Sequence, residues 1–166
     1  MMAQTARSGS EKGSDLSRFW GEIESEGWGA NHPYLLLLGL DPVDTPRLVE
    51  RVEEGFSFRE LERLRQNMGL SREEMSELVQ IRPRTLDRRK KEGRLHPDES
   101  DRLLRASRVF GRAIALFEGN AEGALRLLSS PQGALGGAVP LEMARTETGA
   151  REVEALIGRL EHGVFS

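Results

Sequence analysis

The chain has 166 residues, of which 37% are hydrophobic and 31% are charged, and its formal net charge is −3. Its lack of cysteine excludes disulfides and thiolate metal sites. The longest apolar run, Tyr34–Leu40, is far shorter than the roughly 20 residues that span a bilayer, and residues 1–13 lack the apolar stretch of a signal peptide. We therefore expect a soluble cytoplasmic protein with no membrane partner.

The first third of the chain is predicted to form a helical extension behind a disordered start. Residues 1–15 are rich in Ser, Gly and Thr, a composition typical of disorder. Within residues 16–55, apolar side chains at helical spacing predict a helix that ends near Glu26. A second helix is predicted over Pro46–Glu54, because proline suits the first helical position, where the backbone N–H has no helical acceptor.

Residues 56–118 are predicted to form a second helical unit. Ser57 and Ser71 are each followed three residues later by a glutamate. This is the capping-box pattern, in which a hydroxyl and a carboxylate satisfy backbone donors at a helix start. Gly69 and Gly93 stand where glycine commonly ends a helix. The predicted helices run from Ser57 to Gly69, from Ser71 over a short stretch, from Pro83 to Gly93, and from Pro97 to about Glu118.

Residues 119–166 are predicted to form a smaller helical unit. A helix over Ala121–Leu128 is followed by a glycine-rich loop up to Pro140. The last helix, between about Thr148 and His162, carries an apolar stripe that must pack on another surface. Because the sequence shows no convincing alternating strand, we predict an all-α fold.

Two of the predicted helices form a pair in which the second is strongly basic. Residues 57–118 carry 15 Lys and Arg against 11 Asp and Glu, whereas the flanking segments are net acidic. Within residues 82–94, seven basic residues stand against two acidic ones. Ser76 is small where the two helices must approach, and Ile81 and Leu86 are apolar where contacts would lock them. Two short helices joined by a tight turn predict a helix-turn-helix that binds DNA.

The predicted DNA contacts follow from the position of each residue in the basic helix. Early residues of a recognition helix lie nearest to base edges, and arginine matches the acceptor pair of guanine. Two positions depart from the common pattern, since glycine would suit the turn better than Gln80, and Ser or Thr would cap the helix better than Arg82. A solvated basic face that binds nothing is the alternative. The predicted base contacts are Arg84, Asp87 and Arg88, and the predicted phosphate contacts are Arg82, Thr85, Lys91 and Arg94.

Two stretches of the chain carry motifs in an order typical of one protein family. Residues 69–93 (GLSREEMSELVQIRPRTLDRRKKEG) and the helix after them resemble the Xre-type helix-turn-helix of MbcA/ParS/Xre antitoxins. Residues 133–165 resemble the toxin-binding domain of that family. The markers in this second stretch are Ala134–Gly137, Pro140–Leu141, Thr146–Glu147, Gly149–Ala150 and Arg159–Phe165.

The resemblance implies an Xre-like helix-turn-helix domain over residues 56–118 and a small helical toxin-binding domain over residues 119–166. It also implies an antitoxin that binds a cognate RES-domain toxin, a protein that consumes NAD⁺ or uses it for ADP-ribosylation. Antitoxins of this type form homodimers, block the NAD⁺ pocket of the toxin with their C-terminal segment, and often bind operator DNA to repress their own operon. Carried over to this chain, the toxin-facing residues are Arg159, Glu161, His162, Gly163, Val164, Phe165 and Ser166.

A second interpretation remains open, a stand-alone transcriptional regulator whose last domain dimerises or senses a ligand. Enzymatic activity is not expected, because the sequence supports no pairing of a nucleophile with a base. The three histidines lack the spacing of metal ligands, and the loop Gly133–Gly137 lacks the Lys–Ser/Thr of a phosphate-binding loop. We therefore expect no catalytic residue, no metal and no cofactor.

Overall fold

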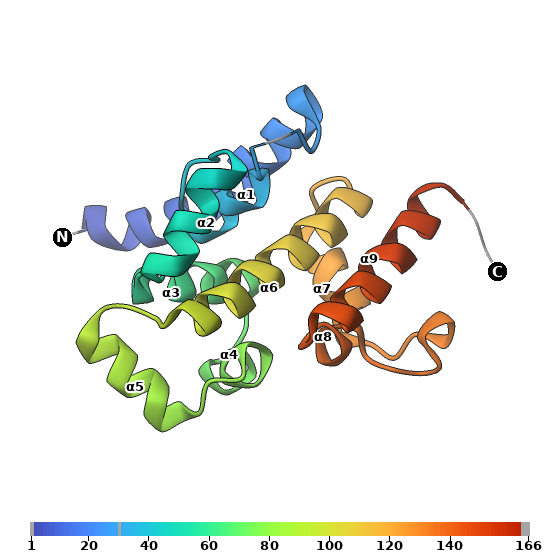
Figure 1. The fold of residues 1–166 in the computed structure, drawn as a ribbon. Coiled ribbons are helices and arrows are strands. Elements are labelled where there is room, and N and C mark those ends of the chain that lie inside the picture. Colours follow the sequence, from blue (N-terminus) through green and yellow to red (C-terminus); the bar gives the residue numbers. More distant parts are fainter. Residues whose placement is uncertain (1, 30, 164–166) are drawn as a thin grey trace.

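The computed structural model describes residues 2–29 and 31–163, and over these ranges the chain is all-α with no strand, as predicted (Figure 1). None of the helices in this part of the chain combines the length and the apolar content needed to cross a bilayer. In chain order, the α-helices and 3-10 helices (η) are α1 (Met2–Glu26), η1 (Pro33–Leu38), α2 (Thr45–Glu54), α3 (Phe58–Met68), α4 (Arg72–Val79), α5 (Pro83–Glu92), α6 (Pro97–Leu116), α7 (Ala121–Ser129), η2 (Gly133–Leu135), α8 (Pro140–Met143) and α9 (Glu147–Glu161).

Helix α1 is fixed to the molecule by a buried carboxylate near its middle. The Asp15 side chain is 3% exposed and accepts hydrogen bonds from Arg63 Nε at 2.5 Å and from Asn67 Nδ2 at 3.0 Å, both in α3. The composition of residues 1–15 predicts disorder, but α1 extends back to Met2. The disorder expected for residues 1–15 stays a prediction, and Asp15 is the residue by which α1 is anchored on α3.

The apolar run that follows α1 forms η1, and all six of its residues are buried. Helix η1 packs against α1, α3 and α6, so the N-terminal extension shares one core with the helices that follow it. His32 precedes η1 with a φ of 56°. Its ring nitrogens lie 2.8 Å from Tyr34 Oη and 2.9 Å from Thr45 Oγ1, which ties the extension to the start of α2.

Helices α3 and α4 begin at serine caps as predicted, but only one of the two predicted capping boxes is complete. At Ser71 both reciprocal hydrogen bonds form, at 3.1 and 2.9 Å. At Ser57 the hydroxyl accepts from Arg59 N at 3.1 Å, and Glu60 returns no hydrogen bond. The capping box predicted at Ser57 is therefore incomplete. The backbone on either side of Ser57 is instead held by Phe58 N, which donates to Gly93 O at 3.0 Å, and by Phe56 O, which accepts from Leu95 N at 2.8 Å.

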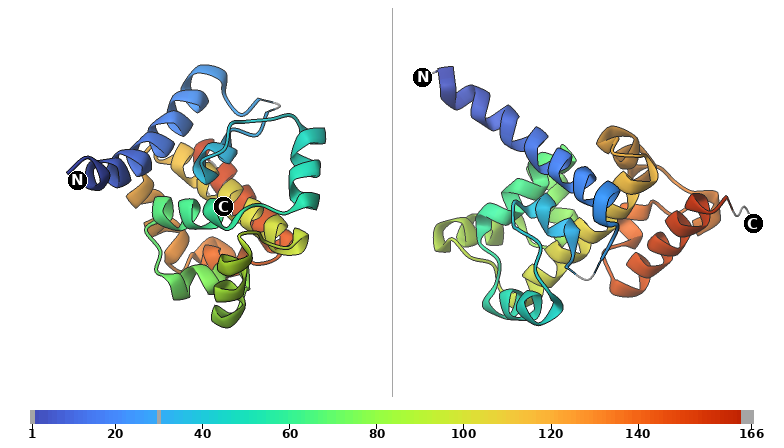
Figure 2. Two further views of the ribbon diagram at one scale, coloured as in Figure 1. Left: turned by 90° about the vertical axis from the view of Figure 1, so that its left-hand side faces the viewer. Right: turned by 90° about the horizontal axis from the view of Figure 1, so that it is seen from above.

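Helix α6 is the central element of the fold. It packs against α1, α2, α3, α4 and η1, and also against α7 and α9. Figure 2 shows α6, in yellow, passing between the N-terminal helices and the C-terminal ones. Its buried side chains include Leu103, Val109, Phe110 and Ile114, none of which is exposed at all. The first and second halves of the chain therefore share a single helix as their common support.

Helices α7, α8 and α9 form the last part of the fold, and α9 packs on α6 and α8. Its predicted apolar stripe is confirmed, since Val153, Leu156 and Ile157 are buried. The start of α9 approaches α8 closely at Gly149, where an added Cβ would lie 1.8 Å from the carbonyl oxygen of Met143. Only glycine fits at this contact, because any larger residue would overlap the backbone of α8.

Candidate functional site

Helices α4 and α5 form the predicted helix-turn-helix. The turn between them places Gln80 at a φ of 54°, a left-handed conformation that glycine adopts more readily. The Ser76 hydroxyl donates to the carbonyl oxygen of Ile81 at 2.5 Å. Ile81 and Leu86 are 3% and 1% exposed. The predicted apolar contacts between the two helices are therefore confirmed.

The outer face of α5 is basic and open to solvent. Arg82, Arg84, Arg88 and Lys91 are exposed, and Thr85 is half-buried. Among the described residues, none of these four basic side chains forms an ion pair. Such unpaired cations on one face can replace the counterions of a phosphate backbone. The structure thus brings together five of the seven residues predicted to contact DNA.

The other two predicted DNA contacts are bonded to the protein itself. Asp87 pairs with Arg72 at the start of α4, and this hydrogen bond lowers the pKa of the Asp87 carboxyl. Both side chains of the pair are largely exposed, so exchanging it for another contact costs little. Arg94 donates to the carbonyl oxygens of Gly55 at 2.8 Å and Glu54 at 3.3 Å.

Arg89 is the one buried basic residue of α5. Its Nε and Nη2 donate to the two carboxylate oxygens of Glu99 in α6 at 2.7 and 3.2 Å, and each side chain is 7% exposed. Burial alone would raise the pKa of Glu99, but hydrogen bonds from Arg89 and from His96 N hold it below its ordinary value. In the sequence, Arg89 is one of the seven basic residues within residues 82–94 and is not among the predicted DNA contacts. Its position three residues after Leu86, on the same side of the helix, is the signal that it points inward.

An ion-pair network joins α6 to the start of α9. Arg105 Nε and Arg108 Nη2 lie 3.0 and 2.9 Å from the two carboxylate oxygens of Glu147. Arg108 Nε also lies 2.5 Å from Glu154. Burial alone would raise the pKa of Glu147. The hydrogen bonds and the charges of Arg105 and Arg108 outweigh burial and hold this pKa below its ordinary value. The network ties α9 to the middle of α6.

The predicted toxin-facing residues lie at the far end of α9. Arg159 is half-buried, and Glu161, His162 and Gly163 are exposed. Gly163 has a φ of 68°, which fits the predicted helix end. Residues 164–166, which complete the predicted set, lie outside the described residues. This end of α9 and helix α5 lie on opposite sides of the molecule in two views (Figures 1 and 2).

The histidines do not gather into a site. His32 bonds to Tyr34 and Thr45, His96 Nδ1 lies 3.1 Å from Arg89 Nη2, and His162 is exposed at the end of α9. Over residues 2–29 and 31–163, no group of three or more His, Asp and Glu side chains could hold a metal ion.

Comparison with known proteins assigns both halves of the chain. A family model described as the antitoxin Xre-like helix-turn-helix domain matches residues 47–108. A second, described as the antitoxin Xre/MbcA/ParS C-terminal toxin-binding domain, matches residues 112–163. The first range contains the α4–α5 pair and the second contains α7, α8 and α9. Helices α1 and η1 precede both ranges.

Three curated relatives carry the name Antitoxin Xre. The protein from Yersinia enterocolitica is 40% identical over 120 residues, which are 72% of this chain and 81% of the relative. The protein from Photorhabdus laumondii is 30% identical over 137 residues, 82% of this chain and 93% of the relative. The protein from Pseudomonas putida is 32% identical over 114 residues, 68% and 70% of the two chains. The chain therefore belongs to the Xre/MbcA/ParS antitoxin family, with a helix-turn-helix domain followed by a toxin-binding domain, neither of them enzymatic.

Proposed function

We propose that this antitoxin neutralises a cognate RES-domain toxin by placing its C-terminal segment in the NAD⁺ pocket of the toxin. The observation that supports this most is the exposed end of α9, Glu161–Gly163, at the edge of a toxin-binding domain. A pocket that admits an anionic dinucleotide needs cations and apolar surface. Glu161 and Phe165 supply the complementary groups, and their presence excludes NAD⁺ sterically. The proposed toxin contacts are Arg159, Glu161, His162, Gly163, Val164, Phe165 and Ser166.

Removal of residues 163–166 tests this mechanism, because it shortens the segment without touching the buried stripe of α9. The assay follows NAD⁺ depletion by the toxin encoded beside the gene of this chain. The full chain should stop depletion, whereas the shortened chain should bind the toxin and leave depletion largely intact. Thermal unfolding of the shortened chain alone, unchanged from the full chain, is the control for folding. Complete protection by the shortened chain would contradict the mechanism.

We also propose that the protein binds operator DNA as a homodimer and represses its own operon. The exposed basic face of α5 supports this proposal, with Arg84, Asp87 and Arg88 as base contacts. Two copies would present their α5 helices to half-sites about 34 Å apart, one turn of DNA. The proposed phosphate contacts are Arg82, Thr85, Lys91 and Arg94.

The double variant Arg84→Ala with Arg88→Ala tests the DNA contacts. If each arginine contributes about 1–3 kcal/mol to base recognition, operator affinity should fall at least about 30-fold. The matched control is Arg47→Ala with Arg126→Ala, which removes two exposed arginines from α2 and α7 and leaves α5 unchanged. The assay measures affinity for the promoter fragment as a function of salt. Equal affinities and salt slopes for the two double variants would show that α5 is not the recognition helix.

The toxin-binding domain favours an antitoxin over a stand-alone regulator with a dimerisation or ligand-sensing domain. A neighbouring reading frame for a RES-domain protein, and its co-purification with this chain, would support the same choice. We place this antitoxin in the cytoplasm, because it would meet both operator DNA and the toxin there.

A further inference from the structure

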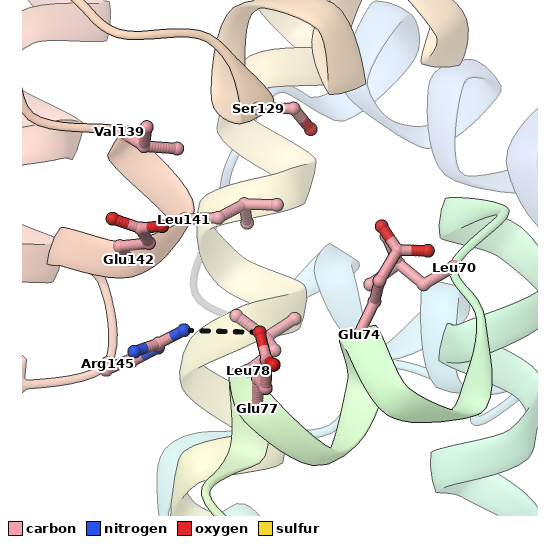
Figure 3. A pocket seen from close by; sticks show the side chains of 9 residues that line it. All are labelled: Leu70, Glu74, Glu77, Leu78, Ser129, Val139, Leu141, Glu142 and Arg145. Carbon is pink, nitrogen blue, oxygen red and sulfur yellow. Dashed lines mark ion pairs between the residues drawn. The ribbon is translucent and has the colours of Figure 1, made fainter.

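A groove lies between the helix-turn-helix and the toxin-binding domain (Figure 3). Its volume is about 150 Å³. Leu70 and Leu78 line it from the side of α4, and Val139 and Leu141 line it from the side of α8. The lining is therefore partly apolar and comes from both domains.

The charged groups around the groove are mainly carboxylates. Glu74 and Glu77 come from α4, and Glu142 comes from α8. The only cation in the lining is Arg145, and Figure 3 shows it facing Glu77 across the groove at 3.7 Å. Glu74 accepts from the backbone at the start of α4, but neither Glu74 nor Glu142 pairs with a cation in the described part of the chain. The groove thus carries a net negative charge.

These properties select the kind of group that fits. A volume of about 150 Å³ is below the roughly 300–1,000 Å³ of most small-molecule sites, which favours a single side chain from a protein. The carboxylates disfavour phosphates and nucleic acid. A lysine or arginine side chain fits best, because its methylene stem suits the leucines and its cationic head suits the glutamates.

The groove is also close enough to the end of α9 for one partner to reach both. Val139, Leu141 and Glu142 lie within the matched toxin-binding domain, residues 112–163. The 15 residues of α9 span about 22 Å between the side of Arg145 and the exposed helix end. A standard interface of about 800 Å² per partner is roughly 30 Å across.

We propose that this groove receives a lysine or arginine side chain of the toxin, as a second contact beside the C-terminal segment. This inference rests on the proposed function, since it takes the toxin as the partner. It also goes beyond it, because the bound toxin then touches α4 and so contacts the helix-turn-helix as well as its own binding domain.

The double variant Glu77→Lys with Glu142→Lys tests the groove by reversing one charge on each wall. Both side chains are exposed, so the fold should tolerate the change. The control, Glu50→Lys with Glu53→Lys, makes the same change in net charge on exposed positions of α2. Calorimetric titration with the toxin encoded beside the gene should show affinity weakened at least about tenfold for the groove variant, with the loss shrinking as salt is raised. The control should stay within about twofold of the unaltered chain.

The folding and the oligomeric state of the groove variant determine how its toxin affinity is interpreted. If charge reversal unfolds the chain, Glu77→Gln with Glu142→Gln takes its place and should weaken binding in the same direction. Unchanged affinity in the folded variant would overturn the proposal. So would unchanged toxin affinity with an altered oligomeric state, which would make a second copy of the chain the occupant.

The same titration separates this inference from the proposed function. At saturating concentration, the groove variant should still stop NAD⁺ depletion, because its C-terminal segment is intact. The chain lacking residues 163–166 should show the reverse, with binding retained and protection lost. If the shortened chain still stops NAD⁺ depletion while the groove variant binds the toxin weakly, the C-terminal segment does not block the pocket. The groove would then still be a toxin contact.

Discussion

Replacing Glu99 with glutamine should destabilise the protein by about 3–5 kcal/mol, because it leaves one charge of a buried pair without its partner. Both side chains are 7% exposed. The carboxylate left to Arg89 in the described part of the chain would be Glu92, at 3.4 Å, whose side chain is 48% exposed. Glutamine keeps an oxygen that can accept from His96 N. The loss of stability therefore measures the effect of removing the charge and not the effect of removing the helix cap. At about 2–4 °C per kcal/mol for a chain of this size, the melting midpoint should fall by about 6–20 °C.

Urea unfolding measures this loss, and Glu92→Gln is the matched control. It removes the exposed partner of the same arginine and should cost less than about 1 kcal/mol. Replacing both buried residues, as Arg89→Met with Glu99→Leu, should recover most of the stability, because no charge is then left unpaired. Equal losses for Glu99→Gln and Glu92→Gln would refute the view that the buried pair anchors α5.

The pH dependence supplies a second check on the same pair. The pKa of Glu99 in the folded protein lies below its ordinary value of 4.5. The pair therefore stabilises the fold fully above about pH 4.5, and this contribution is lost as the pH falls through the lowered pKa. The difference in unfolding free energy between the unaltered chain and Glu99→Gln should shrink over that acid range. A difference that stays constant would contradict the assignment.

Two further predictions concern a glycine contact and a histidine. Gly149→Ala should lower the free energy of unfolding by about 3 kcal/mol or more, because its Cβ would lie 1.8 Å from Met143 O. The control Gly158→Ala, whose Cβ meets no atom within 4 Å, should raise it by about 0.5–1 kcal/mol. Equal melting midpoints for the two variants would contradict the close contact at Gly149. Burial lowers the pKa of His32 against the opposing charge of Asp44, so its contribution to stability is present above pH 6.5 and lost as the pH falls through the lowered pKa. Urea unfolding above and below pH 6.5 should show this loss in the unaltered chain and a smaller one in His32→Asn, since asparagine tolerates the left-handed backbone there.

Local chemistry explains why most helix ends could be predicted from the sequence. A serine cap at Ser71 and glycines in the left-handed region at Gly69 and Gly93 act within a few residues of themselves. The locking contacts at Ile81 and Leu86 were equally predictable, because their spacing follows from the geometry of two helices and a turn. At Ser57 the same pattern predicted a full capping box, but only the serine half of it forms.

The N-terminal extension shows where such reasoning stops. Residues Pro33–Leu38 are buried on all sides, and a short run of that kind has no amphipathic period to recognise. Asp15 accepts a hydrogen bond from Arg63, 48 residues away, and no local sequence pattern predicts such a pair. For the candidate site, the exposed face of α5 agrees with the predicted residues. The spacing of Arg89 from Leu86 indicates that it points inward, but its partner Glu99 lies in α6, ten residues further along the chain, and no local pattern predicts that pair. The roles of the DNA-facing and toxin-facing residues stay predictions.

The boundary between the two domains falls inside helix α6. One family match ends at residue 108 and the other begins at residue 112, and both positions lie inside Pro97–Leu116. A gene fusion at this junction would join two half-helices, each shaped to pack on different neighbours. A chimera that takes one domain from a relative should fold only if the buried residues of α6 match the neighbours on both sides. A change in a buried residue of α6 should therefore affect the helix-turn-helix domain and the toxin-binding domain together.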